Sequence, residues 1–499
     1  MTDFTTARHS SSLPRINIGI GDLRQITDLA WNAILQANDP PYLFRHGGLP
    51  CRLESNDQNI PIVRGLTPTR LRHEIARVAR WFAIVKGEEI EAKPPRDVVQ
   101  DVLATPNPPL PVLKRITRVP VFASDGSLQT TPGYHEKSQT YYTPMADFEL
   151  MEASNSPTPE EIDYARTIIV DELFGDFCFV SDADRVHAVG LFLLPHARDL
   201  IDGPTPNHLI SSPEPGSAKG LLTDVALRAA IPNPGSVSQA RDEDEWRKRL
   251  TSYLRESREV MSIDNVNKPL DSGTLALALT QMTWEDRILG RNETVTLPIR
   301  CIWTTTANNP TMSTEIARRT IRIRLDTGLE RPWLRTGFRH ENLRQWVDEN
   351  RDFLVWAAHT LIQAWISAGR PRPKCKSLGS YEAWSSVIGG ILENAHIQSF
   401  LGNLDEFYEA ADAEGEVWRN FVSIWAEHFA EKEVGANDLF PLAVAQGEFD
   451  LQGSQHSQRV AFGKQLARQR DRVISDYRIV YIGKAQRAAK WKLLGIRRK

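Results

Sequence analysis

The segment 209–222 constrains the fold of this chain more than any other. A short apolar strand is followed by a loop of Pro, Glu, Gly and Ser, then by Lys219, and then by a helical pattern from Leu221. Phosphate-binding loops have this order, because backbone N–H groups of the loop and of the helix N-terminus point at the anion while the lysine reaches the outer phosphates. An ordinary turn is the alternative. The candidate phosphate-binding residues are Pro215, Gly216, Ser217, Ala218, Lys219, Gly220 and Leu221.

Three further motifs follow in an order that suits nucleotide hydrolysis. An apolar strand ends at Asp264, where a carboxylate could hold nucleotide-bound Mg²⁺. A β-type run over 299–306 leads to Asn308, whose amide could orient the attacking water. Arg318 and Arg319 end a short helical pattern and suit an arginine finger, a cation that stabilises the transferred charge. Each motif alone is most often structural, but their order together predicts an α/β ATPase core with ATP and Mg²⁺ as cofactors.

This order of motifs resembles the AAA+-type ATPase core of replicative helicases of mobile elements, which are related to superfamily 3 and MCM-like helicases. The resemblance covers roughly residues 110–499. It implies a ring, expected to be a homo-hexamer, in which the arginine finger acts on the nucleotide of a neighbouring subunit. The residues that carry the resemblance are Lys219, Asp264-Asn265, Thr306-Ala307-Asn308-Asn309 and Ala317-Arg318-Arg319.

The resemblance also implies a hairpin that faces the central pore of the ring and contacts single-stranded DNA. The matching region is 282–297, with a turn near its middle. Lys268, Arg287 and Arg291 are the candidate contacts, since basic side chains follow the backbone of a single strand. For Arg287, a structural ion pair with Asp286 is the alternative.

The chain departs from the usual pattern of this family at three positions. Ala218 replaces a glycine, and a methyl group in a glycine-only conformation would cost roughly 1–3 kcal/mol. Gly220 lacks the hydroxyl group that usually ligates Mg²⁺. Asn265 replaces the glutamate that acts as general base in most AAA+ proteins, so Asp264 or Asp271 would position the water. We therefore expect nucleotide binding to be more secure than fast hydrolysis.

Composition agrees with a large soluble protein. A chain of 499 residues with 41 % apolar and 25 % charged residues is long enough for about three globular domains. No apolar run reaches the roughly 18 residues that a membrane span needs, and the N-terminus lacks the apolar stretch of a signal peptide. Four scattered cysteines favour reduced thiols and a cytoplasmic location. They are Cys51, Cys178, Cys301 and Cys375.

The C-terminal segment is strongly basic. Residues 459–499 contain 13 Lys and Arg but two Asp and Glu, whereas the whole chain has a net charge of −3. A helical pattern over 457–474 precedes two β-type runs within 477–494, and a short helix precedes both, which is the order of a winged helix. DNA is the expected partner, although a winged helix that contacts only protein is the alternative. The candidate DNA contacts are Arg468, Arg470, Arg472, Lys484 and Arg487.

These observations predict an α/β fold of five parts. In the first part, helical patterns lie near 21–36 and 68–86. The parts are 1–93, an N-terminal α+β domain; 94–158, a linker and strand-rich segment; 159–335, an AAA+-type P-loop ATPase core; 336–432, a helical lid; and 433–499, a winged helix.

The predicted function is that of an ATP-dependent, ring-forming DNA helicase or translocase of a mobile genetic element. Two alternatives stay open. The first is a DNA-binding replication initiator or helicase loader. In this alternative, nucleotide binding switches the protein between states and little ATP is hydrolysed. The second is a defence-related ATPase on the same core that acts on a protein partner.

Overall fold

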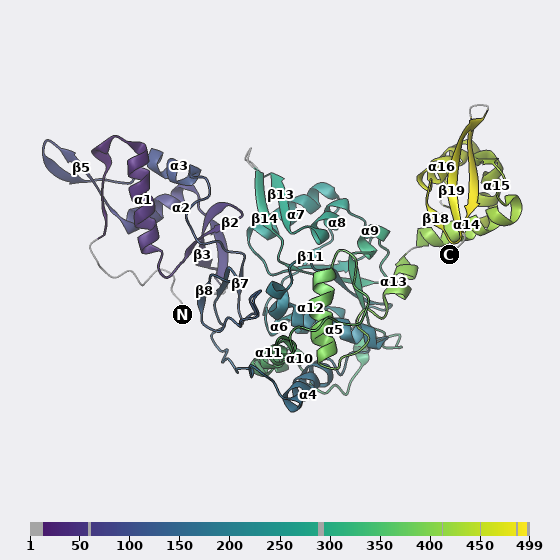
Figure 1. Cartoon of the computed structure of the whole chain (residues 1–499), viewed down its shortest axis with the longest axis horizontal. Coiled ribbons are helices and arrows are strands. Elements are labelled where there is room, and N and C mark those ends of the chain that lie inside the picture. Colours follow the sequence, from purple (N-terminus) through teal and green to yellow (C-terminus); the bar gives the residue numbers. More distant parts are fainter. Residues whose placement is uncertain are drawn as a thin grey trace. The chain divides into compact units, whose positions relative to one another are not determined.

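The computed structural model describes residues 13–57, 61–287, 294–411, 413–449, 451–485 and 488–496. The chain divides into two compact units, Met1–Leu404 and Asp405–Lys499, which are described separately below (Figure 1). Of the helices within the described residues, none has both the length and the apolar composition that a membrane crossing requires.

The N-terminal region of the first unit is α+β. Helices α1 (Leu23–Ala37), α2 (Pro68–Val78) and α3 (Arg96–Ala104) pack together beside a three-stranded sheet of β1 (Arg15–Asn17), β5 (Arg80–Val85) and β6 (Glu88–Glu91). The helical pattern near 68–86 therefore ends early, because the chain continues as β5. Trp81 of β5 is buried in this core.

Helix α3 lies where the sequence predicts part of a linker. Its buried side chains Val98, Val99 and Val102 belong to the same core as α1 and α2. The prolines on both sides of this helix concealed it, although Pro95 stands at its N-cap, where proline is compatible with a helix start.

Two small three-stranded sheets lie within residues 43–142 of the first unit. One contains β2 (Leu43–His46), β3 (Leu49–Ser55) and β4 (Pro61–Gly65), and the other contains β7 (Arg115–Thr117), β8 (Gly133–His135) and β9 (Thr140–Tyr142). Phe44, Tyr134 and Tyr141 join the two sheets through ring contacts.

A five-stranded parallel sheet forms the centre of the first unit, so the fold is mixed α/β. Its order is β11-β12-β15-β10-β16, and every neighbouring pair is parallel. Strands β10 and β15 are buried along almost their whole length, as expected of central strands covered on both faces. The strands are β10 (Asn207–Ser212), β11 (Val237–Ser238), β12 (Val260–Val266), β15 (Ile302–Asn308) and β16 (Thr320–Arg324).

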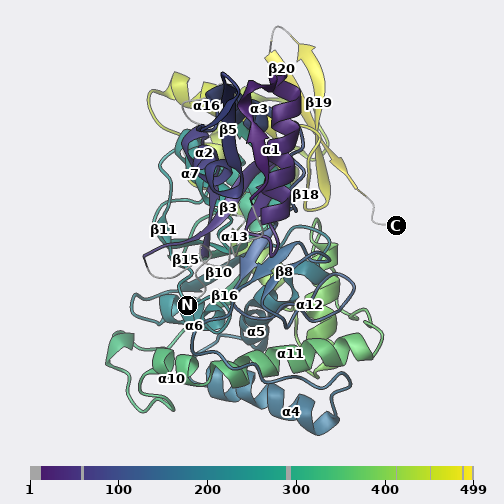
Figure 2. The same ribbon diagram turned by 90° about the vertical axis from the view of Figure 1, so that its left-hand side faces the viewer.

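Helices surround this sheet. Helix α5 packs against β16, α6 against β10 and β15, and α12 against α5, while α11 packs on α4 and α12 (Figure 2). The remaining helix bounds are α4 (Pro159–Thr167), α5 (Asp182–Ala197), α6 (Lys219–Arg228), α7 (Glu243–Arg255), α8 (Gly273–Thr280), α9 (Thr314–Ala317), α10 (Leu343–Glu349), α11 (Arg351–Ser367) and α12 (Glu382–Asn394).

An antiparallel hairpin of β13 (Thr283–Arg287) and β14 (Thr294–Pro298) emerges between β12 and β15 in the sequence and packs on α7. It occupies the region that the resemblance identifies as a pore hairpin. The predicted turn around Arg291 lies outside the described residues.

Charged side chains are buried at the amino-terminal edge of the parallel sheet. Arg115 forms an ion pair with Asp199 at 2.9 Å and lies 3.8 Å from Glu259, the residue before β12. Burial raises the pKa of Glu259 to about 7, although Arg115 and Arg118 oppose this shift.

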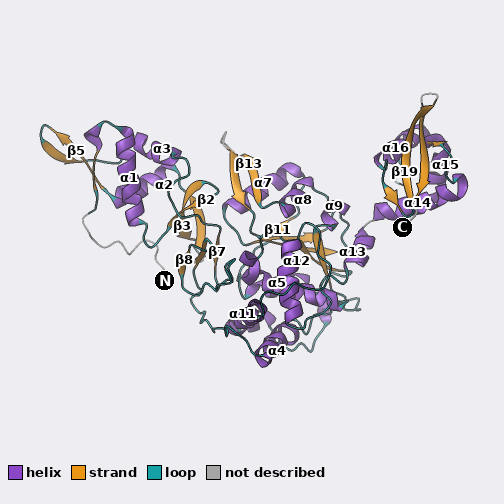
Figure 3. Cartoon of the chain, in the orientation of Figure 1, coloured by secondary structure: helices purple, strands orange, loops and turns teal. Residues whose placement is uncertain are grey.

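The second unit combines helices with a sheet (Figure 3). This sheet has four antiparallel strands in the order β17-β20-β19-β18. The core of the unit includes Trp418, Phe421 and Trp425 of α14 together with Phe462 and Trp491. The helical segment predicted over 336–432 is thus divided, since α14 packs in the C-terminal unit. The elements are α13 (Leu404–Ala411), α14 (Ala413–Phe429), β17 (Val434–Gly435), α15 (Ala436–Gln446), α16 (Gln455–Arg468), β18 (Val473–Ile474), β19 (Tyr477–Ala485) and β20 (Ala488–Gly495).

Candidate functional site

The predicted phosphate loop joins the carboxyl end of β10 to the start of α6. Ser212 Oγ and Ser217 Oγ both donate to the carbonyl oxygen of Glu214, at 2.7 and 2.6 Å, so the loop is folded by its own short polar side chains. Gly216 has φ 77° and Ala218 has φ 63°. Ala218 therefore adopts the left-handed backbone in which the sequence analysis expects a methyl group to cause strain.

Lys219, the first residue of α6, lies inside this loop. Its Nζ donates to Ser212 Oγ at 2.6 Å, to Asn308 Oδ1 at 2.5 Å and to the Glu214 carbonyl at 3.3 Å. Burial lowers the pKa of Lys219, while the charge of Asp264 opposes the shift. Among the described residues the ammonium group makes no ion pair, so its charge faces neutral oxygens and is available to an anion.

Asp264 and Asn308 come to the same edge because β15 separates β10 from β12. Ser212 is in register with Asn308, and Ala307 with Val266. Neighbouring strands are about 4.8 Å apart, so the tips of β10 and β12 are on the order of 10 Å apart, with Asn308 between them. Ligands of open parallel sheets bind in the crevice beyond these carboxyl ends.

The tip of β12 is bent so that Asp264 is exposed. The register shifts between Ile263 and Val266, and Asn265 has φ 52°, which marks a bulge. Thr306 Oγ donates to Asp264 Oδ1 at 2.5 Å and accepts the Asn265 N–H at 2.8 Å. One carboxylate oxygen is thereby fixed in place, and the other remains open.

This carboxylate fits Mg²⁺ in the way that nucleotide sites usually hold it. No group of three or more His, Cys, Asp or Glu side chains within the described residues could hold a metal ion by itself. A single carboxylate is sufficient when phosphate oxygens and waters supply the other ligands. Gly220 provides no hydroxyl group, and Ser212 is the nearest hydroxyl that contacts Lys219.

Arg318 and Arg319 lie at the opposite edge of the sheet. The Asn207 N–H donates to the Arg319 carbonyl at 2.9 Å, and Thr320 is in register with Asn207, the first residue of β10. Both guanidinium groups pair with Glu315, at 3.0 and 2.6 Å. Since β10 has six residues, the arginines are about 16 Å from the loop of their own chain.

The described candidate pore residues, Lys268 and Arg287, make no contact with the predicted phosphate loop. Lys268 lines a cavity of about 470 Å³ beside Asp264. Asp286 pairs with Arg247 at 2.8 Å and accepts the backbone N–H of Arg287, also at 2.8 Å. Within the described residues the alternative Asp286–Arg287 ion pair is not present, and the Arg287 side chain is exposed. Arg291 lies outside the described residues.

Four of the five predicted DNA contacts of the C-terminal unit are exposed. Arg468 ends α16, Arg470 lies 5.1 Å above the Tyr481 ring, and Arg472 donates to Gln469 Oε1 at 2.6 Å. Lys484 is exposed on β19. Arg487 lies in the part of the hairpin that is not described.

Three residues of the site have no role in the sequence-based prediction, although Thr306 belongs to a segment that carries the resemblance. Ser212 and Thr306 are polar residues at the ends of apolar strands, a signal that could have identified them. Trp333 is 59 % exposed and lies against the loop, since a methyl group on Gly216 would be 2.9 Å from its Cε3 atom. No local pattern connects Trp333 with a loop more than a hundred residues earlier.

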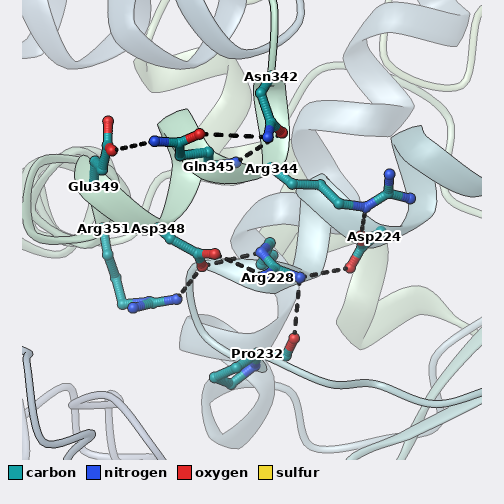
Figure 4. Close-up of polar contacts among 9 residues, drawn as sticks. All are labelled: Asp224, Arg228, Pro232, Asn342, Arg344, Gln345, Asp348, Glu349 and Arg351. Carbon is teal, nitrogen blue, oxygen red and sulfur yellow. Dashed lines mark hydrogen bonds and ion pairs between the residues drawn. The ribbon is translucent and has the colours of Figure 1, made fainter.

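A polar network ties the helix that begins at the loop to α10 and α11. Arg228, at the end of α6, donates to both carboxylate oxygens of Asp348, at 2.9 and 2.7 Å (Figure 4). Arg351 donates to the same carboxylate at 2.5 Å, and Arg344 donates to Asp224 at 2.5 Å. The hydrogen bonds to Asp348 raise the pKa of Arg228.

Comparisons with known proteins give little further support. No family model matches the chain, and no curated protein is similar to it. Among solved structures, a weak similarity is found to one titled "The crystal structure of N-(4-(2-(thiazolo[5,4-c]pyridin-2-yl)phenoxy)phenyl)acetamide bound to JCV Helicase". The two chains are 12 % identical, with 50 % of this chain and 73 % of that chain covered and a TM-score of 0.20. These values are too low to carry an argument about function.

Proposed function

We propose that the first unit binds ATP with Mg²⁺ at the β10–α6 loop and hydrolyses it. The observation that carries this proposal is the Lys219 ammonium group, held by Ser212 and Asn308 without an acidic partner among the described residues. A lysine in this position neutralises the outer phosphates, and loop N–H groups complete the cradle.

In this proposal each residue has a separate task. Asp264 would hold Mg²⁺, which supplies charge neutralisation at the phosphates. Asn308, at the tip of β15, would orient the attacking water through its amide. Its Oδ1 accepts a hydrogen bond from Lys219. The N–H₂ group at the other end of the amide would be the part that contacts the water. Arg318 and Arg319 would act on the nucleotide of a neighbouring chain, since they lie at the edge away from their own loop.

The nucleotide site can be tested with two substitutions and a matched control. Lys219→Ala should abolish binding of a fluorescent ATP analogue, whereas Asp264→Ala should keep binding but lower turnover by at least about 100-fold, as expected for loss of a main electrostatic contact. Lys86→Ala removes an exposed lysine far along the chain and should change neither. If both site variants hydrolyse ATP as the parent does, the site is misassigned.

The whole chain is proposed to act on DNA as a ring-forming helicase or translocase. Experiments, and not the fold, distinguish these two roles. Arg318→Ala should leave nucleotide binding unchanged yet abolish turnover, and Lys219→Ala chains mixed with parent chains should give dominant inhibition. Mass photometry with ATP and DNA should detect a ring, expected to be a hexamer. A protein that stays monomeric under these conditions would contradict the assignment of the arginines.

The C-terminal unit is proposed to contact duplex DNA as a winged helix. Support comes from the exposed basic side chains on α16, on the following turn and on β19. Reversing Arg468, Arg470 and Lys484 to Glu should lower the log–log salt slope of duplex binding by about 2.7, or 0.9 for each lost phosphate contact. ATP turnover without DNA should persist. Unchanged affinity and salt slope would identify this face as a protein-docking surface.

One observation favours a second function, a nucleotide switch with little hydrolysis. Ala218 keeps a left-handed backbone with a methyl group, and Gly220 supplies no hydroxyl to Mg²⁺. ATP-dependent DNA binding or assembly with negligible turnover, both lost in Lys219→Ala, would support an initiator or loader over a helicase.

A further inference from the structure

A cleft of about 700 Å³ lies in the first unit, apart from the phosphate loop. One wall is formed by β3, the end of β4, the start of α2 and the end of α3, and the other by α7 and β14. Neither Lys219 nor Asp264 lines it. The cleft is therefore a feature that the proposed ATP site does not explain.

The two walls are held together by close packing. Gly47, in the turn between β2 and β3, has φ 56°, and a methyl group there would be 2.7 Å from Leu297 Cδ2 of β14. The neighbouring His46 ring is buried, with Nδ1 2.9 Å from the Leu113 carbonyl and Nε2 3.2 Å from the Leu254 carbonyl of α7. The N-terminal hairpin is thereby fixed against α7 and β14.

The lining of the cleft is strongly basic. Four lining side chains are Arg or Lys and one is acidic, although the whole chain has a net charge of −3. The acidic residue, Glu256, already accepts a hydrogen bond from Arg258 at 2.7 Å. Lys248 and Arg255 are exposed and make no ion pair within the described residues. The four cations are Arg64, Arg70, Lys248 and Arg255.

These cations form a stripe and not a single point. Lys248, Ser252 and Arg255 are spaced four and three residues apart on α7, so they share one face of the helix over about 10 Å. On the opposite wall, Arg64 and Arg70 flank the start of α2, whose dipole also favours anions. A stripe of this kind matches a chain of phosphates better than one isolated phosphate.

The rest of the lining suits the less polar parts of nucleotides. Leu49, Leu66 and Leu103 supply apolar surface, and Val295 and Leu297 lie buried behind it. The described lining residues include no Phe, Tyr or Trp ring on which a base could stack, and the His46 ring is buried. Binding should therefore depend on salt and be indifferent to base identity. The volume holds on the order of two nucleotides, far less than a duplex needs.

We propose that this cleft binds the phosphate backbone of a single nucleic-acid strand, at a site separate from the ATP loop. The cations on its two walls contact successive phosphates, and Leu49, Leu66 and Leu103 contact sugars and bases.

The test uses the full chain and a fluorescein-labelled oligo(dT). Lys248→Glu with Arg255→Glu should weaken binding about 25-fold at 0.1 M salt and lower the salt slope by about 1.4, since each contact with a single strand contributes about 0.7 to the slope. Lys248→Arg with Arg255→Lys should bind as the parent does. Lys86→Glu with Lys93→Glu changes the same charge on exposed residues outside the cleft and should also bind normally.

Two further measurements locate the effect. An oligo(dT) that carries photoreactive 4-thiothymidine should crosslink to α7 or to the β4–α2 segment in the parent, and not in the Glu variant. ATP turnover without DNA should be the same in both, and Lys219→Ala should still bind oligo(dT), so failure of the ATP site and failure of the cleft give different results.

Equal affinity and crosslinking of the Glu variant and the parent would overturn the proposal. A Glu variant that loses binding of free ATP at a second site, yet keeps oligo(dT) binding, would show a free-nucleotide site and would also overturn it.

Discussion

Replacing Ala218 with Gly should stabilise this protein, although removal of a methyl group usually does not. Ala218 is exposed and has φ 63° and ψ 21° at the N-cap of α6. An L-residue in this conformation is disfavoured by about 1–2 kcal/mol because Cβ approaches a carbonyl oxygen. Glycine avoids this contact but loses about 0.4–1 kcal/mol through the greater freedom of the unfolded chain. The net gain is about 1 kcal/mol, roughly a fivefold change in the folding equilibrium.

Chemical denaturation of the parent and of Ala218→Gly, with and without Mg-ATP, measures this gain. Ala226→Gly is the control, because Ala226 lies within the same helix and is buried. There the substitution should lower the free energy of unfolding by about 1 kcal/mol or more. The stabilisation given by Mg-ATP should be kept or increased in Ala218→Gly, because the loop N–H groups turn more freely. If both substitutions destabilise equally, Ala218 is not left-handed in solution and the strain argument fails.

Three further predictions test other parts of the first unit. The pKa of Glu259 is raised from 4.5 to about 7, so the unfolded state binds fewer protons in this window and the free energy of unfolding falls as pH rises through it. Glu259→Gln should remove this fall, about 3 kcal/mol in full, between denaturation curves at pH 5 and pH 8. Asp348→Ala should lower the free energy of unfolding by about 1–2 kcal/mol, because Arg228 loses two hydrogen bonds, whereas exposed Glu349→Ala should change it little. The Trp333 contribution to fluorescence, taken as the difference between the parent and Trp333→Phe, should change when Mg-ATP binds; no difference would place the nucleotide away from this ring.

Local patterns in the sequence were sufficient for the central elements. The apolar run before the Pro/Gly loop predicts β10 and α6, and strands were expected where β12 and β15 occur. These signals depend on a few neighbouring residues: apolar runs form buried strands, and Pro and Gly end them. Their boundaries shift by a few residues, since the predicted run 299–306 became β15 from Ile302 to Asn308.

Partners in packing were not predictable in the same way. The tryptophans of α14 indicate a buried helix face, but periodicity does not say which surface covers it. Trp418 and Trp425 pack with Phe462 and Trp491 of the second unit, whereas Trp365 and Trp384 lie in helices of the first.

The candidate site depends on strand order, which no single motif contains. Lys219 and Asn308 meet because β15 lies beside β10 in the sheet, 89 residues apart along the chain. The sequence could state that each residue ends a strand, and carboxyl ends of parallel strands meet at one edge. It could not state that Asn308, and not Asp264, would contact the lysine directly.

The strand order also decides how Arg318 and Arg319 could contribute to catalysis. Both residues precede β16, at the amino end of β10, while the phosphate loop follows the carboxyl end. The separation of about 16 Å exceeds the reach of an arginine side chain, so a role at their own loop is excluded without a large rearrangement. In the single chain both guanidinium groups are occupied by Glu315. A phosphate of another chain would have to compete with that carboxylate, so assembly and release of Glu315 are coupled conditions for any arginine-finger function.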